Sequence, residues 1–159
     1  MELIRHHKED VVADYDVNLS QLHLRVWQDE LGLSGTISEY GHIEFGRQGP
    51  GILSIRLAKA NPGGATIDYS IVDDYYDIGL TTESALDICN KVNMFSSGAM
   101  LVDGGGTIEA RLPLFYLPLD DTGALPDEGF LRAWIGPAMS EIETATREFA
   151  HRLKKKAED

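Results

Sequence analysis

Apolar side chains near the start of the chain recur at the spacing of a helix, and further along they alternate as they do in strands. The apolar side of the first predicted helix consists of Leu19, Leu22, Val26 and Leu31. Asn18 is predicted to cap this helix, because Gln21 completes a capping-box pattern with it. Gly32 is predicted to end the helix, since glycine readily adopts the left-handed conformation that closes one.

The alternation begins after Gly35 and predicts three consecutive strands. Their alternating apolar positions are Ile37, Ile43 and Phe45, then Leu53, Ile55 and Leu57, then Ile67, Tyr69 and Ile71. An interruption near Tyr40 divides the first of these stretches. Glycine and proline within residues 47–51 and 61–64 predict the turns that join the strands. Connections this short favour an antiparallel meander.

Residues 81–118 change once more from helix to strand. Thr81 or Thr82 caps a second predicted helix, and its apolar face consists of Ala85, Ile88, Cys89 and Val92. A strand over residues 99–102, a glycine-rich turn and a returning strand over residues 107–116 then predict a β-hairpin. Pro113 predicts that the returning strand lies near a sheet edge or loses regular pairing there, because proline donates no ladder hydrogen bond.

The last predicted helix covers residues 127–155, and Gly136-Pro137 is expected to kink or split it. The order of elements is therefore α-β-β-β-α-β-β-α. It predicts an α+β domain with one antiparallel sheet of about five strands and three packing helices. The length fits a single domain over residues 1–159, in which residues 1–16 form a flexible arm or one added strand.

The charge balance limits the classes of partner. Fourteen basic and 26 acidic side chains give a formal net charge of -12. Such a surface repels phosphate backbones and anionic lipids, which argues against nucleic-acid and membrane partners. It favours a basic or partly unfolded protein segment, although the same charge could serve solubility alone. With no apolar run of signal-peptide or membrane-span length and a lone cysteine, the chain is expected to be cytoplasmic.

Covalent and metal chemistry find little support in the residue pattern. Cys89 is the candidate nucleophile, but its place in the middle of an apolar helix face predicts a buried thiol. The histidines are scattered over different predicted elements: His6, His7, His23, His42 and His151. A protein metal site needs three or four converging ligands. No catalytic residue, metal or cofactor is therefore predicted, and a thiol or metal-dependent hydrolase stays a minor alternative.

Two groups of residues are candidates for binding another protein. An acidic and aromatic cluster after the third strand could meet a basic partner or form only a solvated loop; its members are Asp73, Asp74, Tyr75, Tyr76 and Asp77. A predicted interface includes Trp27, which lies beside the main apolar stripe of the first helix and belongs to a residue type enriched at binding hot spots. Its other members, on one strand, are Ala99, Met100, Leu101 and Val102.

Several motifs of the chain carry a family resemblance. Residues 90–95 read Asn-Lys-Val-Asn-Met-Phe, residues 99–104 read Ala-Met-Leu-Val-Asp-Gly, the returning strand ends in Leu-Pro-Leu, and the closing helix contains Phe149-Ala150. In these motifs and in its order of elements, the chain resembles the YbjN-like family, whose fold is shared by type III secretion chaperones. One position departs from the family pattern, since Val92 stands where the family often has tryptophan.

The resemblance implies a non-enzymatic module, often a homodimer, that binds a client polypeptide segment in a chaperone-like way. The alternative that it implies is a sensory or signalling adaptor, which regulates another protein through the same fold. Binding by a module of this kind could use the addition of a strand to a sheet edge, or docking into a groove.

Overall fold

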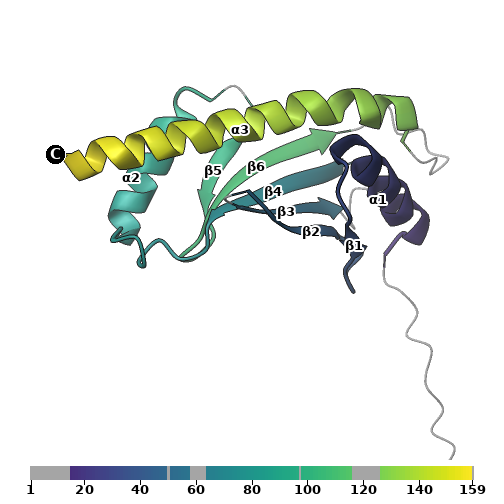
Figure 1. Cartoon of the computed structure of the whole chain (residues 1–159), viewed down its shortest axis with the longest axis horizontal. Helices are drawn as coiled ribbons and strands as arrows, with labels where there is room; N and C mark the ends of the chain where they lie inside the picture. Colours follow the sequence, from purple (N-terminus) through teal and green to yellow (C-terminus); the bar gives the residue numbers. More distant parts are fainter. Residues whose placement is uncertain (1–14, 50, 58–63, 97, 116–125, 159) are drawn as a thin grey trace, which may run out of the picture.

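The computed structural model describes residues 15–49, 51–57, 64–96, 98–115 and 126–158, and these form one antiparallel sheet with helices against it (Figure 1). The helices are α1 (Val17–Leu31), α2 (Thr82–Asn93) and α3 (Glu128–Glu158). The strands are β1 (Thr36–Ile37), β2 (Ile43–Gln48), β3 (Gly51–Leu57), β4 (Gly64–Val72), β5 (Met100–Asp103) and β6 (Ile108–Phe115). The predicted α+β class is confirmed. The sheet has six strands because the segment before Tyr40 forms a two-residue strand of its own. Of the predicted arm, all but residues 15 and 16 lies outside the described residues.

The spatial order of the strands is β1-β2-β3-β4-β6-β5. Strands β1 to β4 form the predicted meander. The chain then passes through α2, forms β5 at the far edge and returns as β6 between β4 and β5. Pro113 pairs with Thr66 of β4 but lies beyond the stretch of β6 that pairs with β5. It therefore has a strand on one side only, near the sheet edge as predicted, while regular pairing with β4 continues through it to Phe115.

Local capping chemistry sets the ends of the first two helices. Asp16 caps α1, because its side chain accepts a hydrogen bond from the Leu19 N–H at 3.0 Å, so the predicted cap at Asn18 is wrong. Asparagine and aspartate cap about equally well, and a cap pattern alone does not choose between neighbouring candidates. Gly32 ends α1 in the left-handed conformation, as predicted. Thr81 caps α2 and forms a reciprocal capping box with Ser84.

The third helix is continuous over 31 residues and extends along the sheet toward α2 (Figure 1). It runs through Gly136-Pro137, so the predicted split is wrong. Proline removes the donor that would bond the Ala133 carbonyl. Ala133 and Pro137 are both exposed, so water can bond that carbonyl instead. Gly136 has no Cβ to crowd the proline ring, which eases the helical conformation before a proline.

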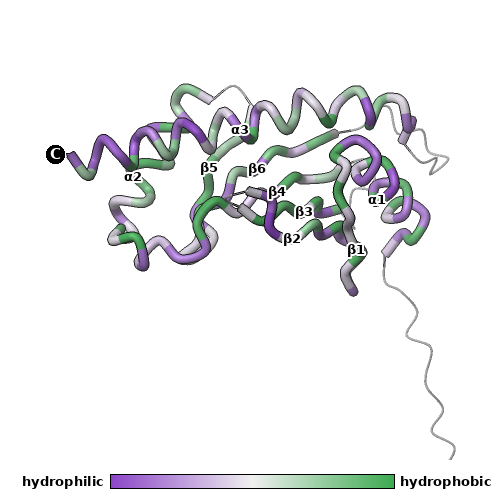
Figure 2. Tube along the Cα trace, viewed as in Figure 1, coloured by the Kyte–Doolittle hydropathy of each residue, from purple (hydrophilic) through white to green (hydrophobic). Residues whose placement is uncertain are grey.

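All three helices contribute to one core against the sheet. The largest buried side chains include Trp27 of α1, Ile135 of α3 and the strand residues Ile43, Ile55 and Ile67. In β3, buried residues alternate with exposed or half-buried ones, as expected for a strand with helices on one side. Figure 2 shows hydrophobic stretches along the strands and a hydrophilic C-terminal end of α3.

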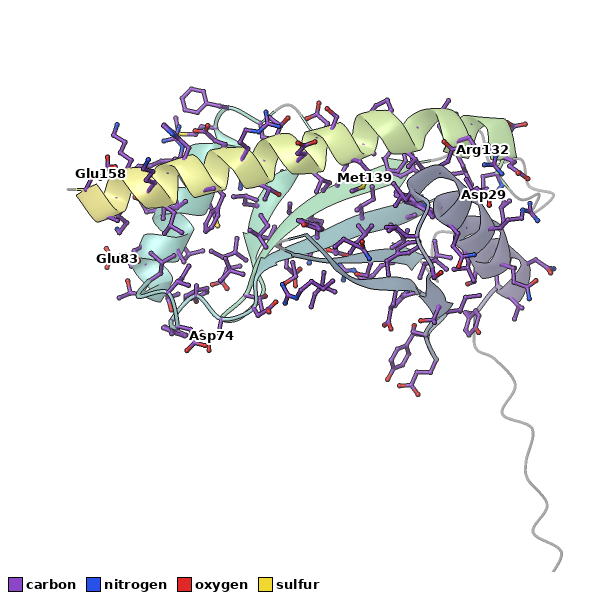
Figure 3. All side chains as sticks on the ribbon, viewed as in Figure 1. Asp29, Asp74, Glu83, Arg132, Met139 and Glu158 are labelled. Atoms are coloured by element: carbon purple, nitrogen blue, oxygen red, sulfur yellow. The ribbon has the colours of Figure 1, made fainter. Side chains whose placement is uncertain are left out.

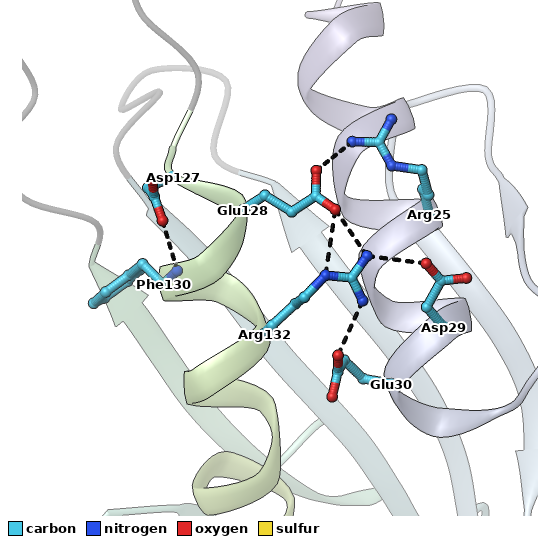
Figure 4. Close-up of polar contacts among 7 residues, drawn as sticks. All are labelled: Arg25, Asp29, Glu30, Asp127, Glu128, Phe130 and Arg132. Carbon is cyan, nitrogen blue, oxygen red and sulfur yellow. Dashed lines mark hydrogen bonds and ion pairs between the residues drawn. The ribbon is translucent and has the colours of Figure 1, made fainter.

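A charged junction holds α1 against the start of α3 (Figure 4). Arg132 contacts Asp29 and Glu30 of α1 at 3.0 and 2.9 Å, and Glu128 contacts Arg25 at 2.7 Å. Hydrogen bonds from Arg132 and Arg25 hold the pKa of Glu128 below its usual value. Exposed ion pairs add little stability one by one. Arg132 instead bridges two carboxylates of α1 through different guanidinium nitrogens, which fixes how the two helices meet.

Gly32→Ala is expected to lower the free energy of unfolding by about 1 kcal/mol. Gly32 has a φ of 66°, and a Cβ added there would meet no atom within 4 Å, so the cost is conformational rather than steric. Gly32→Asn is the matched control, because asparagine tolerates this conformation and should recover part of the loss. Urea denaturation of the three proteins measures the difference. An alanine variant as stable as the parent would contradict the prediction.

Candidate protein-binding surface

Cys89 does not have the surroundings of a reactive thiol. Its side chain is buried in the core, with 3% of the residue's surface exposed. Burial, assisted by the negative charge of Asp103, raises its pKa to about 11. The thiol is therefore protonated at neutral pH, as the predicted burial implied. Within the described part of the chain, no three His, Cys, Asp or Glu side chains are placed to share a metal ion.

The structure places Trp27 in the core rather than on the surface. The indole is fully buried and meets Trp134 edge to face, with ring centroids 6.3 Å apart. Its Nε1–H donates a hydrogen bond to Nδ1 of His23 at 3.3 Å. Burial lowers the pKa of His23 to about 4, so this imidazole is neutral in the folded protein. The buried Trp27 and His23 and the half-buried Trp134 form an aromatic cluster between α1 and α3.

The other predicted interface residues divide into two sets along β5. Ala99 and Leu101 are buried, whereas Met100 is exposed and Val102 is half-buried. Met100 and Val102 pair with Arg111 and Glu109 of β6, on the sheet face turned away from the core. Only these two side chains of the set are therefore available for contact with another molecule.

The outer edge of β5 is already occupied by a side chain. Asn93, the last residue of α2, accepts a hydrogen bond from the Leu101 N–H at 2.7 Å and donates one to the Leu101 carbonyl at 2.8 Å. The Ser96 hydroxyl bonds the Ala99 carbonyl in the same way. The asparagine side chain thus takes the place that a neighbouring strand would have. This protects the edge against the addition of another strand.

The edge formed by β2 is protected by different means. β1 pairs only with Ile43 and Glu44, and the ladder between β2 and β3 carries an irregularity between Glu44 and Gly46. The Gln48 side chain donates a hydrogen bond to the Phe45 carbonyl at 3.0 Å. Bulges and occupied backbone groups both hinder strand addition.

The acidic and aromatic cluster is largely engaged with its own neighbourhood. Asp73 is paired with Arg47, and Asp74 accepts a hydrogen bond from the Tyr76 N–H at 2.9 Å. Tyr75 is buried, and its hydroxyl lies 3.2 Å from both Thr82 and Asp103. Asp77 and the Tyr76 ring remain exposed. The predicted patch is thus a structured loop before α2, in which two of three aspartates are used internally.

Asp103 organises the glycine-rich turn, a role that the sequence pattern did not reveal. Its carboxylate accepts hydrogen bonds from the N–H groups of Gly106 at 3.2 Å and Gly105 at 2.8 Å. These bonds hold the pKa of Asp103 below its usual value. The predicted hairpin turn is confirmed, and its polar side chain serves the turn itself.

The solvent face of the sheet carries a balanced ladder of ion pairs. Asp68 of β4 lies between Arg56 of β3 and Arg111 of β6, with Arg111 at 2.7 Å. Arg111 also contacts Glu109 at 3.0 Å. Charges of both signs neutralise one another here, so the acidic excess of the chain lies elsewhere.

The most exposed apolar side chains gather where α2 ends. Met94 and Phe95 are 76% and 75% exposed, and Leu86 on α2 is also exposed. They lie outside the apolar helix face of Ala85 to Val92 that faces the core. Their position directly after a helix end is the sequence feature that could have indicated their exposure. That feature does not distinguish a surface residue from one that folds back into the core.

A groove lies beside Phe95, between the end of α2 and α3. Its volume is about 150 Å³, and its lining consists of Val92, Phe95, Ser96, Glu141, Thr144, Ala145 and Glu148. Val92 and Ala145 are buried and apolar, whereas Glu141 and Glu148 are half-buried. The groove therefore combines an apolar floor, one aromatic wall and an acidic rim.

Charged side chains of both signs surround this end of the molecule. Figure 3 shows Asp74 before α2, Glu83 on α2 and Glu158 on α3 at the end of the molecule opposite Asp29 and Arg132. The same end also carries basic side chains, Lys91 on α2 and Arg152, Lys154, Lys155 and Lys156 on α3, so charges of both signs lie around the groove.

Comparison with known proteins adds no further assignment. Neither the protein-family models nor the curated proteins contain a match to this chain. The family resemblance therefore stays a prediction that rests on the motifs quoted above. Among the described helices, none has the length and apolar character required to cross a membrane.

Proposed function

We propose that this chain is a non-enzymatic, YbjN-like binding module that holds a segment of another polypeptide at the α2 end and works as a homodimer. The observation that carries the proposal is the exposure of Met94 and Phe95 beside a groove with an apolar floor. Exposed large apolar side chains next to a hollow are typical of docking sites. The proposal needs no covalent step, in keeping with a buried and protonated Cys89.

Docking into the groove is the favoured mode of binding. Strand addition needs an edge with free backbone groups. Asn93 occupies those of Leu101 at one edge, and Gln48 bonds the Phe45 carbonyl near the bulge of the other. A bound segment would instead contact side chains of α2, its exit and α3.

The uncharged stripe of α2 supports the homodimer. Its exposed members at helical spacing are Thr82, Leu86 and Asn90. Two copies with a net charge of -12 each repel each other. This electrostatic repulsion is smallest when the copies meet through an uncharged stripe. A helix of 12 residues is about 18 Å long. One face of such a helix buries less than the roughly 800 Å² per partner that is usual in a stable interface. Met100 and Val102 on the neighbouring β5 could enlarge the contact.

Capture from the native cell tests the proposal if an exposed aromatic variant is compared with a matched control. The Phe95→Ser variant is expected to capture at least about 80% less of a specific polypeptide than the parent protein does. The reason is that aromatic hot-spot residues carry a large share of the binding energy. Tyr40→Ser is the control, since Tyr40 is 70% exposed but lies in the β1–β2 turn. Light scattering on the same samples measures the dimer. Equal capture by all three proteins, or no specific polypeptide with any, would contradict the proposal.

A further inference from the structure

His42 joins the β1–β2 turn to the end of β3 through its side chain. The imidazole Nδ1 accepts a hydrogen bond from the Leu57 N–H at 3.2 Å. The ladder between β2 and β3 ends at the pair Ile43 and Ile55, two residues before Leu57. The ring therefore stands where a longer β2 would supply a backbone partner, and it satisfies an N–H group that this ladder does not reach.

The backbone of the same turn is held by hydrogen bonds of its own. The Ser38 N–H donates to the His42 carbonyl at 2.8 Å, and the His42 N–H donates to the Ser38 hydroxyl at 3.1 Å. The Ser20 hydroxyl of α1 donates to the Gly41 carbonyl at 2.7 Å. These bonds do not involve the imidazole, so the turn can stay attached to α1 when the ring loses Leu57.

The bond to Leu57 exists in one protonation state of the ring. Nδ1 accepts a hydrogen bond only while it carries no proton, so the neutral imidazole has its hydrogen on Nε2. In the charged imidazolium both ring nitrogens are donors. The Nδ1–H of His42 would then face the Leu57 N–H, and two donors cannot bond each other.

Charged groups from three strands face this imidazole. Burial and the positive charge of Arg56 on β3 lower the pKa of His42, while Glu44 on β2 and Asp68 on β4 oppose this shift. The Tyr40 ring of the turn packs beside it, with ring centroids 6.4 Å apart. The surroundings thus favour the neutral ring that the bond to Leu57 requires.

A comparison with His23 shows why this position can respond to pH. The Nδ1 of His23 also accepts a hydrogen bond, from Trp27, but this histidine is fully buried in the core. His42 is half-buried and lies at the end of a ladder. Local opening at a strand end costs less free energy than opening of the core. His42 can therefore take up a proton while the rest of the fold stays intact.

We propose that His42 is a proton-operated latch, which holds the end of β3 against the β1–β2 turn when neutral and releases it when charged. A proton binds the released form more tightly than the closed form, so a fall in pH shifts the population toward release. The latch lies beside α1, at the opposite end of the molecule from α2 and the proposed binding groove (Figure 1).

Two-dimensional NMR of the full chain between about pH 7.5 and 5, a range in which an imidazole titrates, tests the latch. Ring nitrogen shifts should place the hydrogen of the neutral His42 ring on Nε2. The Leu57 amide resonance should move with the same midpoint as this ring. The exchange protection of the Leu57 amide, corrected for the intrinsic effect of pH, should fall at least about tenfold across that midpoint. Ile55, which pairs with Ile43 inside the ladder, should keep its protection.

Four variants separate the latch from other titrating groups. His42→Asn keeps an acceptor, because Oδ1 of asparagine can accept from the Leu57 N–H but does not titrate, so protection should persist and become independent of pH. His42→Leu has no acceptor and should lose at least about tenfold protection at neutral pH as well. His151→Asn replaces an exposed histidine of α3 and should leave the titration of Leu57 unchanged. Glu44→Gln removes a negative charge near the ring and should lower the shared midpoint.

The latch would be overturned by a neutral ring protonated at Nδ1, by a ring that stays neutral over this range, or by a Leu57 amide that does not titrate with His42. Parent-like protection in His42→Leu, or a persistent pH response of Leu57 in His42→Asn, would also overturn it. If His42→Leu does not fold, His42→Asn and the ring shifts still decide. Loss of protection at Ile55 together with Leu57 would show opening of the whole sheet and would contradict a local release.

Discussion

Replacement of Asn93 by alanine is expected to lower the free energy of unfolding by about 3 kcal/mol. Asn93 makes two hydrogen bonds to the backbone of Leu101, a residue that is almost fully buried. The variant leaves a buried N–H and a buried carbonyl without these partners, and each such group costs about 1–3 kcal/mol. Urea denaturation followed by far-ultraviolet circular dichroism measures the loss.

Asn90→Ala is the matched control, because Asn90 is an exposed asparagine on the same helix. It should change stability by less than about 0.5 kcal/mol, as is usual for exposed positions. Asn93→Asp gives a second comparison. Aspartate can still accept from the Leu101 N–H, but it sets a charged oxygen against the Leu101 carbonyl at the C-terminal end of α2, so it should recover little or none of the stability that alanine loses.

The same substitution is expected to expose the edge of β5. An edge strand with free N–H and carbonyl groups is a template for another strand. Light scattering should therefore detect concentration-dependent oligomers of Asn93→Ala above those of the parent protein, and none of this increase for Asn90→Ala. An Asn93→Ala protein with the parent's stability and assembly would show that the side chain does not guard this edge.

Periodicity predicted the fold because the core itself is periodic. In β3 the alternation of Leu53, Ile55 and Leu57 matches the buried face that helices cover, and in α2 the spacing of Ala85, Ile88 and Val92 does the same. These patterns can be detected in short stretches of sequence, because the burial of each residue follows from its position in its own helix or strand. The class and the strand order of the meander could therefore be predicted.

What could not be predicted depends on contacts between distant segments. In the sequence, Trp27 lies beside the main apolar stripe of its helix. In the structure, Trp134 of α3 packs against it. The sequence indicates only that Asn93 lies at a helix end. Its hydrogen bonds to Leu101 form because β5 packs against α2. The groove beside Phe95 likewise needs α3 to pass next to the α2 exit. A binding surface of this kind is a property of the assembled elements.

The buried histidine of α1 predicts a loss of stability in mild acid. Burial lowers the pKa of His23 to about 4 in the folded protein, while the unfolded chain has a value near 6.5. Between these two values the unfolded chain binds a proton that the folded protein does not bind. The free energy of unfolding is therefore highest above pH 6.5 and falls by about 3 kcal/mol as the pH is lowered to 4.

His23→Asn separates this contribution from that of other titrating groups. Its Oδ1 can still accept the hydrogen bond from Trp27 Nε1 that His23 Nδ1 now accepts, but the side chain does not titrate. His42, whose pKa is also lowered, and the carboxylates of Asp103 and Glu128 remain in both proteins, so their contributions cancel in the comparison. The variant should be less stable than the parent at pH 7.5 because it loses ring packing, yet change less between pH 7.5 and 4.5. Parallel pH profiles from urea denaturation would mean that His23 takes up its proton without cost in the folded state, against the burial that the structure gives it.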